Sequence, residues 1–262
     1  MNLQVLVSTM HQEDYSLLER MNIKTDAIII NQCDKNDFCE FNYNNHNIKW
    51  MSFNERGVGL SRNNALMRAT GDICLMADDD MVYSIDYNET VTTAFKKNPK
   101  ADVILFDVPI HKKDGTIVSK VQKNGRVFYH NCLKYGTVNI AFRREQIIKK
   151  NINFSLLFGG GARYGSGEDT LFIIDCLKKG LKIYSHTSKI ATIHENQSTW
   201  FTGFNEKYFY DRGALFRAIS KKAAYLLALQ FVFRKKSLYK ENMSTKEALN
   251  TMLKGMKEFA EK

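Results

Sequence analysis

The chain has 262 residues, of which 44% are hydrophobic and 12% aromatic, with only two prolines. This composition excludes a disordered protein, and the length allows one large α/β domain with a helical annex. The net charge of +10 indicates an anionic partner, either a membrane surface or an anionic ligand. Nucleic acid is not favoured, because no nucleic-acid-binding motif accompanies the charge.

The cysteines and the first residues bear on the compartment. Five cysteines form no Cys-x-x-Cys pair and are odd in number, so we expect neither a disulfide framework nor a zinc site. We expect no signal peptide, because the N-terminus has no basic segment before its apolar residues. The longest apolar stretch, 223–233, is too short to span a bilayer. We therefore expect a cytoplasmic protein, peripheral on the inner membrane face.

Short apolar runs alternate with helical patterns along the chain, which predicts a mostly parallel sheet flanked by helices. Strands are expected at residues 3–8, 27–30, 48–53, 73–77, 103–108, 138–142 and 181–184. Helices are expected at residues 13–21, 61–69, 86–97, 144–150 and 168–179, and two more in the basic tail. Residues 33–47 are polar and rich in asparagine, which predicts a loop. Residues 158–167 contain five glycines without the Gly-Lys-Ser/Thr of a nucleotide P-loop, which predicts a mobile loop.

Three consecutive carboxylates follow the expected strand at 73–77. Asp78, Asp79 and Asp80 repel one another unless a cation lies between them. In an extended chain Asp78 and Asp80 point to the same side, so the pair can hold a divalent ion through oxygen ligands. The alternative is an acidic turn that binds no metal.

Six short motifs occur in a fixed order. They are Arg56-Gly57, Ser61-Arg62-Asn63, Gly71-Asp72, Asp78-Asp79-Asp80, Gly167-Glu168-Asp169-Thr170-Leu171 and His194-Glu195-Asn196-Gln197-Ser198-Thr199. The first four resemble the nucleotide-sugar half of family 2 glycosyltransferases with the GT-A fold. The fifth resembles the Glu-Asp acceptor motif of that family, and the sixth its downstream histidine segment.

The resemblance implies an α/β, GT-A-like fold with a C-terminal helical annex. Residues 1–205 would form the catalytic domain, with 1–85 as its nucleotide-sugar half and 86–205 as its acceptor half. Residues 206–262 would form the basic helical annex.

The resemblance also implies the donor site. The residues that would bind the nucleotide-sugar are Thr9, Gln32, Asp34, Arg56, Gly57, Arg62, Asp78 and Asp79. The metal, Mn²⁺ or Mg²⁺, would be held by Asp80, with Asp78 and His194. Where the family often carries paired acids after the second strand, this chain has Asn31-Gln32, with Asp34 further on. The alternatives are a solvated helix residue for Arg62 and a strand-end histidine bonded to a carbonyl for His194.

Glu168 and Asp169 begin a predicted helix, whose dipole favours their ionised forms. An ionised carboxylate can take the proton from an attacking sugar hydroxyl. The resemblance implies Asp169 as this base, with Glu168 orienting the acceptor. The alternative is structural, because residues 166–169 also match a capping box.

These expectations combine into one predicted reaction. One carboxylate base without a second carboxylate nucleophile implies direct displacement with inversion, from a UDP-sugar to a saccharide or lipid-linked acceptor. The resemblance implies a role in building a surface polysaccharide. A nucleotidyltransferase is one alternative, although residues 8–11 do not form the phosphate-binding segment it would carry. A non-catalytic nucleotide-sugar- or glycan-binding module is another, and the intact carboxylates count against it.

Basic residues dominate 212–240, and no acid interrupts them. They are Arg212, Arg217, Lys221, Lys222, Arg234, Lys235, Lys236 and Lys240. Apolar residues such as Leu226, Leu229 and Phe233 lie among them, so we expect the tail from about Arg212 onward to dock on an anionic membrane. The alternative is that the first tail helix packs on the catalytic domain and its lysines face water.

Overall fold

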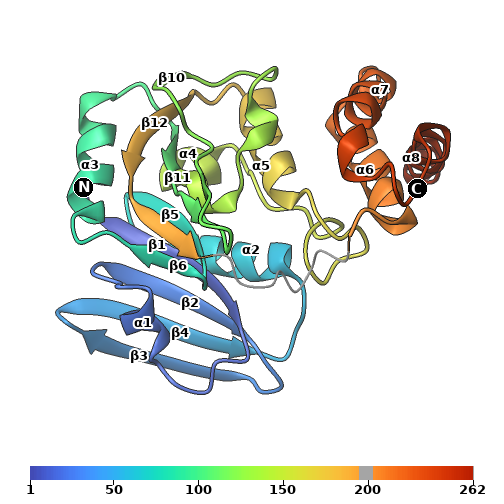
Figure 1. Ribbon diagram of the computed structural model, residues 1–262. Helices are drawn as coiled ribbons and strands as arrows, with labels where there is room; N and C mark the ends of the chain where they lie inside the picture. Colours follow the sequence, from blue (N-terminus) through green and yellow to red (C-terminus); the bar gives the residue numbers. More distant parts are fainter. Residues whose placement is uncertain (195–202, 262) are drawn as a thin grey trace.

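The computed structural model describes residues 1–194 and 203–261. Within these residues a sheet of nine strands runs through the centre, in the order β10-β12-β7-β11-β5-β1-β2-β4-β3 (Figure 1). Its strands are β1 (Leu3–Met10), β2 (Asp26–Gln32), β3 (Asp37–Tyr43), β4 (His46–Phe53), β5 (Ile73–Asp78), β7 (Val103–Asp107), β10 (Gly125–Arg126), β11 (Ile140–Arg143) and β12 (Ile183–Lys189). The neighbours β5, β1, β2 and β4 are parallel. β11 runs antiparallel between β5 and β7, so the whole sheet is mixed.

Helices cover both faces of this sheet. On one face lie α1 (Leu17–Arg20) and α3 (Tyr87–Lys97); on the other lie α2 (Val58–Arg68), α4 (Arg144–Lys149) and α5 (Glu168–Lys178). Strand side chains alternate between the two layers: Val5 and Val7 join the first core, and Leu6 joins the second. The predicted α/β class, with a central sheet flanked by helices, is therefore confirmed.

A second, smaller sheet in the described residues has the order β6-β13-β8-β9. Its strands are β6 (Met81–Tyr83), β8 (Ile110–His111), β9 (Ile117–Val118) and β13 (Ala191–His194). Short 3₁₀ helices complete the description: η1 (Cys132–Lys134), η2 (Thr137–Asn139) and η3 (Lys236–Leu238).

The loop expected at 33–47 is wrong, because the segment contains β3. β3 pairs antiparallel with β4 through a tight turn at Asn44 and Asn45, which have φ of 50° and 67°. Asparagine tolerates this left-handed backbone, so the asparagines mark a hairpin turn. The helix expected at 13–21 is shorter in the structure and comprises only α1. The residues before it form a turn, in which the Asp14 side chain accepts hydrogen bonds from Ser16.

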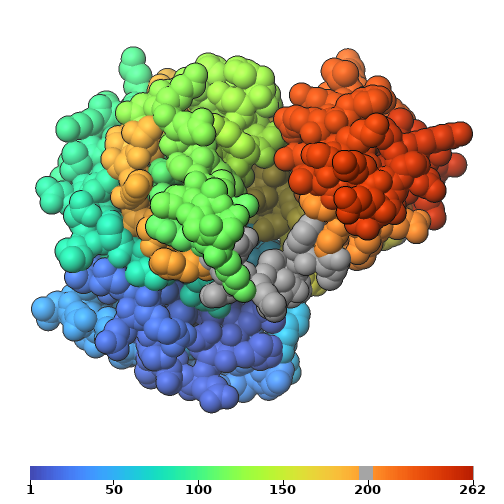
Figure 2. Space-filling view, viewed as in Figure 1, coloured from blue at the N-terminus to red at the C-terminus, as the bar shows by residue number. Residues whose placement is uncertain are grey.

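The C-terminal segment forms three helices rather than two: α6 (Glu206–Ile219), α7 (Ala224–Arg234) and α8 (Thr245–Ala260). Figures 1 and 2 show them, in orange to red, as a lobe at one side of the molecule. α6 packs against both α8 and the glycine segment, and its buried Phe209 and Leu215 share one core with Phe158 and Tyr164. The alternative in which the first tail helix packs on the catalytic part therefore holds for α6.

The start of α8 carries the capping box that its sequence encodes. Ser244 Oγ accepts a hydrogen bond from the Glu247 N–H, and the Glu247 carboxylate accepts one from the Ser244 N–H. Among the helices of the described residues, none has both the length and the apolar character needed to cross a bilayer.

Candidate active site

The carboxyl ends of β5, β1, β2 and β4 meet at one edge of the central sheet. Ser8 pairs with Asp78, Met10 pairs with Gln32, and Gln32 pairs with Phe53. In open α/β sheets, ligands bind in the crevice outside the carboxyl ends of the strands. The register thus gathers the predicted strand-end residues at the edge where a ligand is expected.

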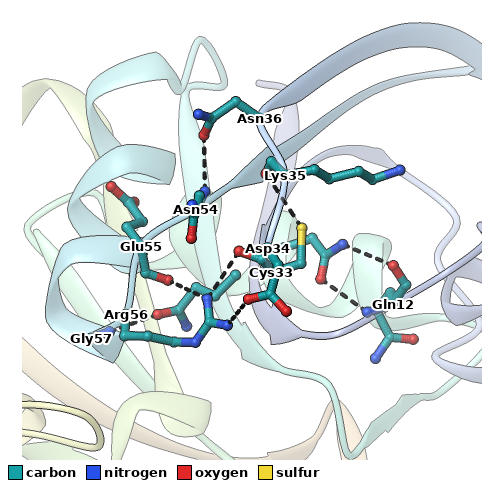
Figure 3. A network of polar contacts seen from close by, with 11 residues as sticks. Gln12, Cys33, Asp34, Lys35, Asn36, Asn54, Glu55, Arg56 and Gly57 are labelled. Carbon is teal, nitrogen blue, oxygen red and sulfur yellow. Dashed lines mark hydrogen bonds and ion pairs between the residues drawn. The ribbon is translucent and has the colours of Figure 1, made fainter.

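Four of the predicted donor residues form one polar network, shown in part in Figure 3. The Arg56 guanidinium donates to Asp34 Oδ1 at 2.6 Å and to the Cys33 carbonyl at 3.0 Å. Gln32 Oε1 accepts from the Gly57 N–H at 2.7 Å. Gly57 has φ 128°, a conformation that glycine adopts without a Cβ penalty, and it caps α2. The network therefore ties the end of β2 to the N-terminus of α2.

The three aspartates at the end of β5 have different partners. The Thr9 hydroxyl donates to Asp79 Oδ2 at 2.5 Å, and Asp78 Oδ1 accepts from Arg62 at 2.7 Å. Asp80 has no ion pair within the described residues. Loss of solvation at the strand end, together with the charges of Asp78 and Asp79, raises the pKa of Asp80 to about 6. A nearby cation would therefore stabilise the ionised form of Asp80.

Arg62 joins the two ends of the site. Its side chain is buried on α2, where Nη1 donates to Glu168 Oε1 at 2.6 Å and Nη2 donates to Asp78 Oδ1 at 2.7 Å. Burial alone would lower the pKa of Arg62, but the two carboxylates raise it above its ordinary value. The guanidinium also lies 5.6 Å from the centroid of the Phe154 ring. The alternative of a solvated helix residue is therefore wrong.

Glu168 and Asp169 differ in their surroundings at the start of α5. Glu168 is buried, and its Oε2 accepts from the Gly167 N–H at 3.0 Å. Burial and the neighbouring Asp169 raise the pKa of Glu168, although Arg62 acts in the opposite direction. Asp169 is half-buried, and its Oδ1 accepts from the Thr170 N–H at 2.6 Å.

The capping-box alternative for residues 166–169 is wrong. The N-cap of α5 is Gly167 in a left-handed conformation, with φ 117°, and no side chain caps the helix. The acidic pair is therefore not explained by helix capping.

The glycine segment packs tightly against this junction. The Gly159 N–H donates to the Tyr164 carbonyl at 2.8 Å, and the Val58 N–H donates to the Gly160 carbonyl at 2.9 Å. A Cβ on Gly159 would lie 2.8 Å from a carboxylate oxygen of Glu168, and one on Gly161 would lie 3.1 Å from the Gly57 nitrogen. These glycines allow the segment to approach the start of α2 and the buried Glu168.

The second sheet brings a histidine to the acidic end of β5. Ile193 pairs with Met81 in antiparallel register, so His194 and Asp80 are the residues next beyond this pair. His194 is exposed, and its ring lies 5.1 Å, centroid to centroid, from the ring of His111 on β8. Sequence reasoning missed His111, because a single histidine in a two-residue strand carries no local signal. The rest of the predicted histidine segment, 195–199, lies outside the described residues.

No group of three or more His, Cys, Asp or Glu side chains is preassembled for a metal ion in the part of the chain that the structure describes. A cation bound at the acidic end of β5 would therefore need further ligands in addition to the side chains in their present positions. Mg²⁺ commonly takes one or two carboxylates together with substrate phosphates, and this donor set fits such an arrangement.

Comparisons with known proteins agree with this geometry. The model of glycosyl transferase family 2 matches residues 15–162, which is more than half of the chain. No curated protein sequence matches significantly.

Solved structures of S. aureus TarS share the fold. TarS 1–349 in complex with UDP-GlcNAc has a TM-score of 0.67 at 15% identity, covering 99% of this chain and 80% of that one. The complex with UDP gives 0.66 at 16% identity, covering 97% and 81%. A further S. aureus TarS structure gives 0.64 at 15% identity, covering 100% of this chain and 49% of that one.

The family match extends from α1 into the glycine segment and includes Arg56, Arg62 and the aspartates at 78–80. The structural matches independently show the GT-A arrangement of sheet and helices over nearly the whole chain. By the family match, the chain belongs to glycosyl transferase family 2 and is a glycosyltransferase.

Proposed function

We propose that this chain is an inverting, metal-dependent glycosyltransferase that moves a sugar from a UDP-linked donor to a hydroxyl of a saccharide or lipid-linked acceptor. The observation that carries the proposal is the double contact of Arg62 with Asp78 and Glu168, at 2.7 and 2.6 Å. One guanidinium thereby joins the acidic strand end, on the donor side, to the start of α5, on the acceptor side. Direct transfer requires these two sides to lie within reach of one another.

The donor would lie along the carboxyl edge of the sheet. Gln32, Asp34, Arg56 and Gly57 form one network there, and the N-terminus of α2 offers a positive dipole to a diphosphate. TarS has been solved with UDP and with UDP-GlcNAc, which supports a UDP-linked donor. The same fold at 15% identity does not specify the sugar.

The metal, Mn²⁺ or Mg²⁺, would be held by Asp80, with Asp78 and His194 as the other ligands nearest in sequence or register. Asp78 already bonds Arg62, so Asp80 would be the main protein ligand and the donor diphosphate would supply the remaining oxygens. When bound, the cation neutralises the negative charge that develops on the leaving diphosphate.

Asp169 would act as the base and Glu168 as its support. Arg62 and the Gly167 N–H occupy both oxygens of Glu168, so Glu168 is tied into the protein. Asp169 has no ion pair within the described residues and is half-buried, which leaves it suited to take the proton of an attacking hydroxyl. A single base implies attack on the face opposite the leaving group, and therefore inversion.

Membership of the family argues against both alternative functions, the nucleotidyltransferase and the non-catalytic binding module. A role in building a surface polysaccharide, at the inner face of a membrane, is the setting that we propose for the reaction.

The test measures how fast the protein hydrolyses the sugar donor in the absence of an acceptor. A panel of UDP-, GDP-, CDP- and dTDP-sugars is incubated with the protein in Mn²⁺ or EDTA, and release of the nucleoside diphosphate is measured. We expect release only from UDP-sugars and only with Mn²⁺. Asp169→Asn should lower the rate by about 10²–10⁴ and leave the UDP-induced rise in melting temperature unchanged.

Asp175→Asn is the matched control, because Asp175 lies on the same helix and pairs with Lys178 away from the site. Its rate should equal that of the wild type. Full turnover in EDTA would contradict the metal, and wild-type turnover by Asp169→Asn would contradict the base. Release from another nucleotide class alone would replace UDP as the donor.

A further inference from the structure

The outer face of α7 is an apolar stripe. Tyr225, Leu226, Leu229 and Phe233 are all exposed, and at 100° per residue they fall within an arc of about 100°. Leu226 is 70% exposed and Phe233 is 66% exposed. We call these four residues the α7 stripe. A contiguous exposed apolar face of this kind marks an interaction surface rather than a folding core.

The opposite face of α7 is already occupied, so the stripe is not needed to hold the helix. Ala228, Phe231 and Val232 are buried, and the Phe231 ring packs edge-on against Phe216 of α6. The Tyr239 hydroxyl donates to the Val232 carbonyl at 2.6 Å and secures the end of the helix. In Figure 1, α7 lies at the top of the lobe.

Positive charge surrounds both ends of the stripe. Lys221 and Lys222 are exposed just before α7, and Arg234, Lys236 and Lys240 are exposed at and after its end. No acidic residue occurs between Arg212 and Lys240. Lysine and arginine can keep their charged ends at the headgroups while their stems cover apolar surface.

We propose that the α7 stripe and its basic ends dock the protein on an anionic lipid bilayer, with α7 lying in the plane of the membrane. The helix has 11 residues and is about 16 Å long, so it lies on a bilayer rather than crossing it. Charge complementarity selects this occupant, because an apolar stripe with cationic ends matches acyl chains beneath anionic headgroups. The docking does not depend on the donor or on catalysis.

The structure narrows the docking element to α7. α6 faces inward: Phe209 and Phe216 are buried, and the Arg212 guanidinium stacks over the rings of Tyr208 and Phe231. Its basic residues therefore contribute less to a membrane surface than those beside α7.

The test is flotation of the full chain with vesicles of neutral phosphatidylcholine, or of phosphatidylcholine with 30% phosphatidylglycerol, at low and high salt. We expect binding to the anionic vesicles, weakened but not abolished by salt, since the Debye length falls to about 3 Å at 1 M. Phe233→Glu or Leu226→Glu should weaken binding about tenfold. Replacing both Lys222 and Lys236 by glutamine should weaken vesicle binding about 25-fold, or about fivefold for each charge removed.

Two controls separate docking from damage. Met67→Glu changes an apolar residue that is 63% exposed on α2, far from α7 in the sequence, and should bind vesicles as the wild type does. The melting temperatures of all variants should equal that of the wild type. If Phe233→Glu unfolds α7, Leu226→Glu is used in its place.

Binding that is equal on neutral and anionic vesicles, or absent from both, overturns the proposal. If the wild type instead self-associates in light scattering and Phe233→Glu makes it monomeric without affecting flotation, a second copy of the chain covers the stripe and the proposal is wrong.

Discussion

Replacing Arg62 by methionine removes the only positive charge that contacts both Asp78 and Glu168 among the described residues. Methionine retains much of the apolar stem and cannot donate a hydrogen bond, so the change isolates the guanidinium. We expect the variant to lose stability and transferase activity together, because the same side chain holds both halves of the site.

The magnitude follows from how far each carboxylate is from water. The side chain of Glu168 is 11% exposed and that of Asp78 is 35% exposed, whereas Arg62 is 4% exposed. Breaking a buried ion pair from one side costs about 3–5 kcal/mol, and an exposed one about 0–1 kcal/mol. We therefore expect a loss of about 4 kcal/mol, mostly from Glu168. In a chain of this size that loss lowers the melting temperature by about 10 °C.

The assay is a double-mutant cycle in urea at pH 7. Arg62→Met with Glu168→Gln leaves no unpaired buried charge at that position, so we expect a coupling energy of about 1–3 kcal/mol. Arg62→Lys should rescue little, because an ammonium is a point charge and cannot bridge two carboxylates as a planar fork does. Because burial and Asp169 raise the pKa of Glu168, the deficit of Arg62→Met should shrink as the pH falls and protonation removes the need of Glu168 for a counter-charge.

Arg68→Met is the matched control on the same helix. Arg68 is exposed, and it donates to Asn64 and lies over the Phe53 ring without pairing with a carboxylate, so its loss should cost no more than about 1 kcal/mol. A loss below about 1 kcal/mol for Arg62→Met, or additive effects in the cycle, would refute the bridging role.

Two further predictions concern Asp80 and the α6–α8 contact. Because its pKa is raised from 3.8 to about 6 in the folded state, ionised Asp80 costs stability that accumulates as the pH rises from about 4 through 6. Asp80→Asn should therefore melt above the wild type at pH 8 in EDTA and equal it at pH 3.5; no gain at pH 8 would contradict the shift. A Cβ on Gly213 would lie 2.0 Å from the Met252 carbonyl oxygen, and one on Gly255 would lie 2.1 Å from that of Tyr210. Each Gly→Ala change should cost about 2 kcal/mol in thermal melts, whereas Gly125→Ala, which points into open space, should cost almost nothing.

Local patterns suffice for a strand that is buried on both sides and for a helix start that its own side chains cap. The apolar run at 73–77 becomes β5, and the Ser244 capping box opens α8 as the sequence indicates. β3 was missed because an edge strand with polar residues on its open side has no apolar run. The direction of β11 was also beyond local reasoning, because it depends on how a long connection returns to the sheet rather than on the strand itself.

The residues of the site likewise divide into those that a strand prediction brings together and those that only the tertiary packing does. Thr9, Gln32 and Asp78 lie together because parallel strands end at one edge, which a strand prediction already implies. The contact between Arg62 and Glu168 joins residues 106 apart in sequence, and each belongs to a separate motif. No periodicity relates them; only the packing of α5 and the glycine segment onto the start of α2 does so.

The position of Arg62 accounts for the different states of the carboxylates around it. Residues 78–80 and 168–169 would repel one another in a partly dry site, and their pKa values would rise together. A single buried guanidinium binds one carboxylate from each group and leaves Asp80 and Asp169 without an ion pair among the described residues. The remaining charge is thereby divided between two places, one at the strand end where a cation would be needed and one at the helix start where a base would be needed. Burying a guanidinium whose Nε has no partner among the described residues carries a cost, and the two charge-assisted hydrogen bonds to Asp78 and Glu168 offset it.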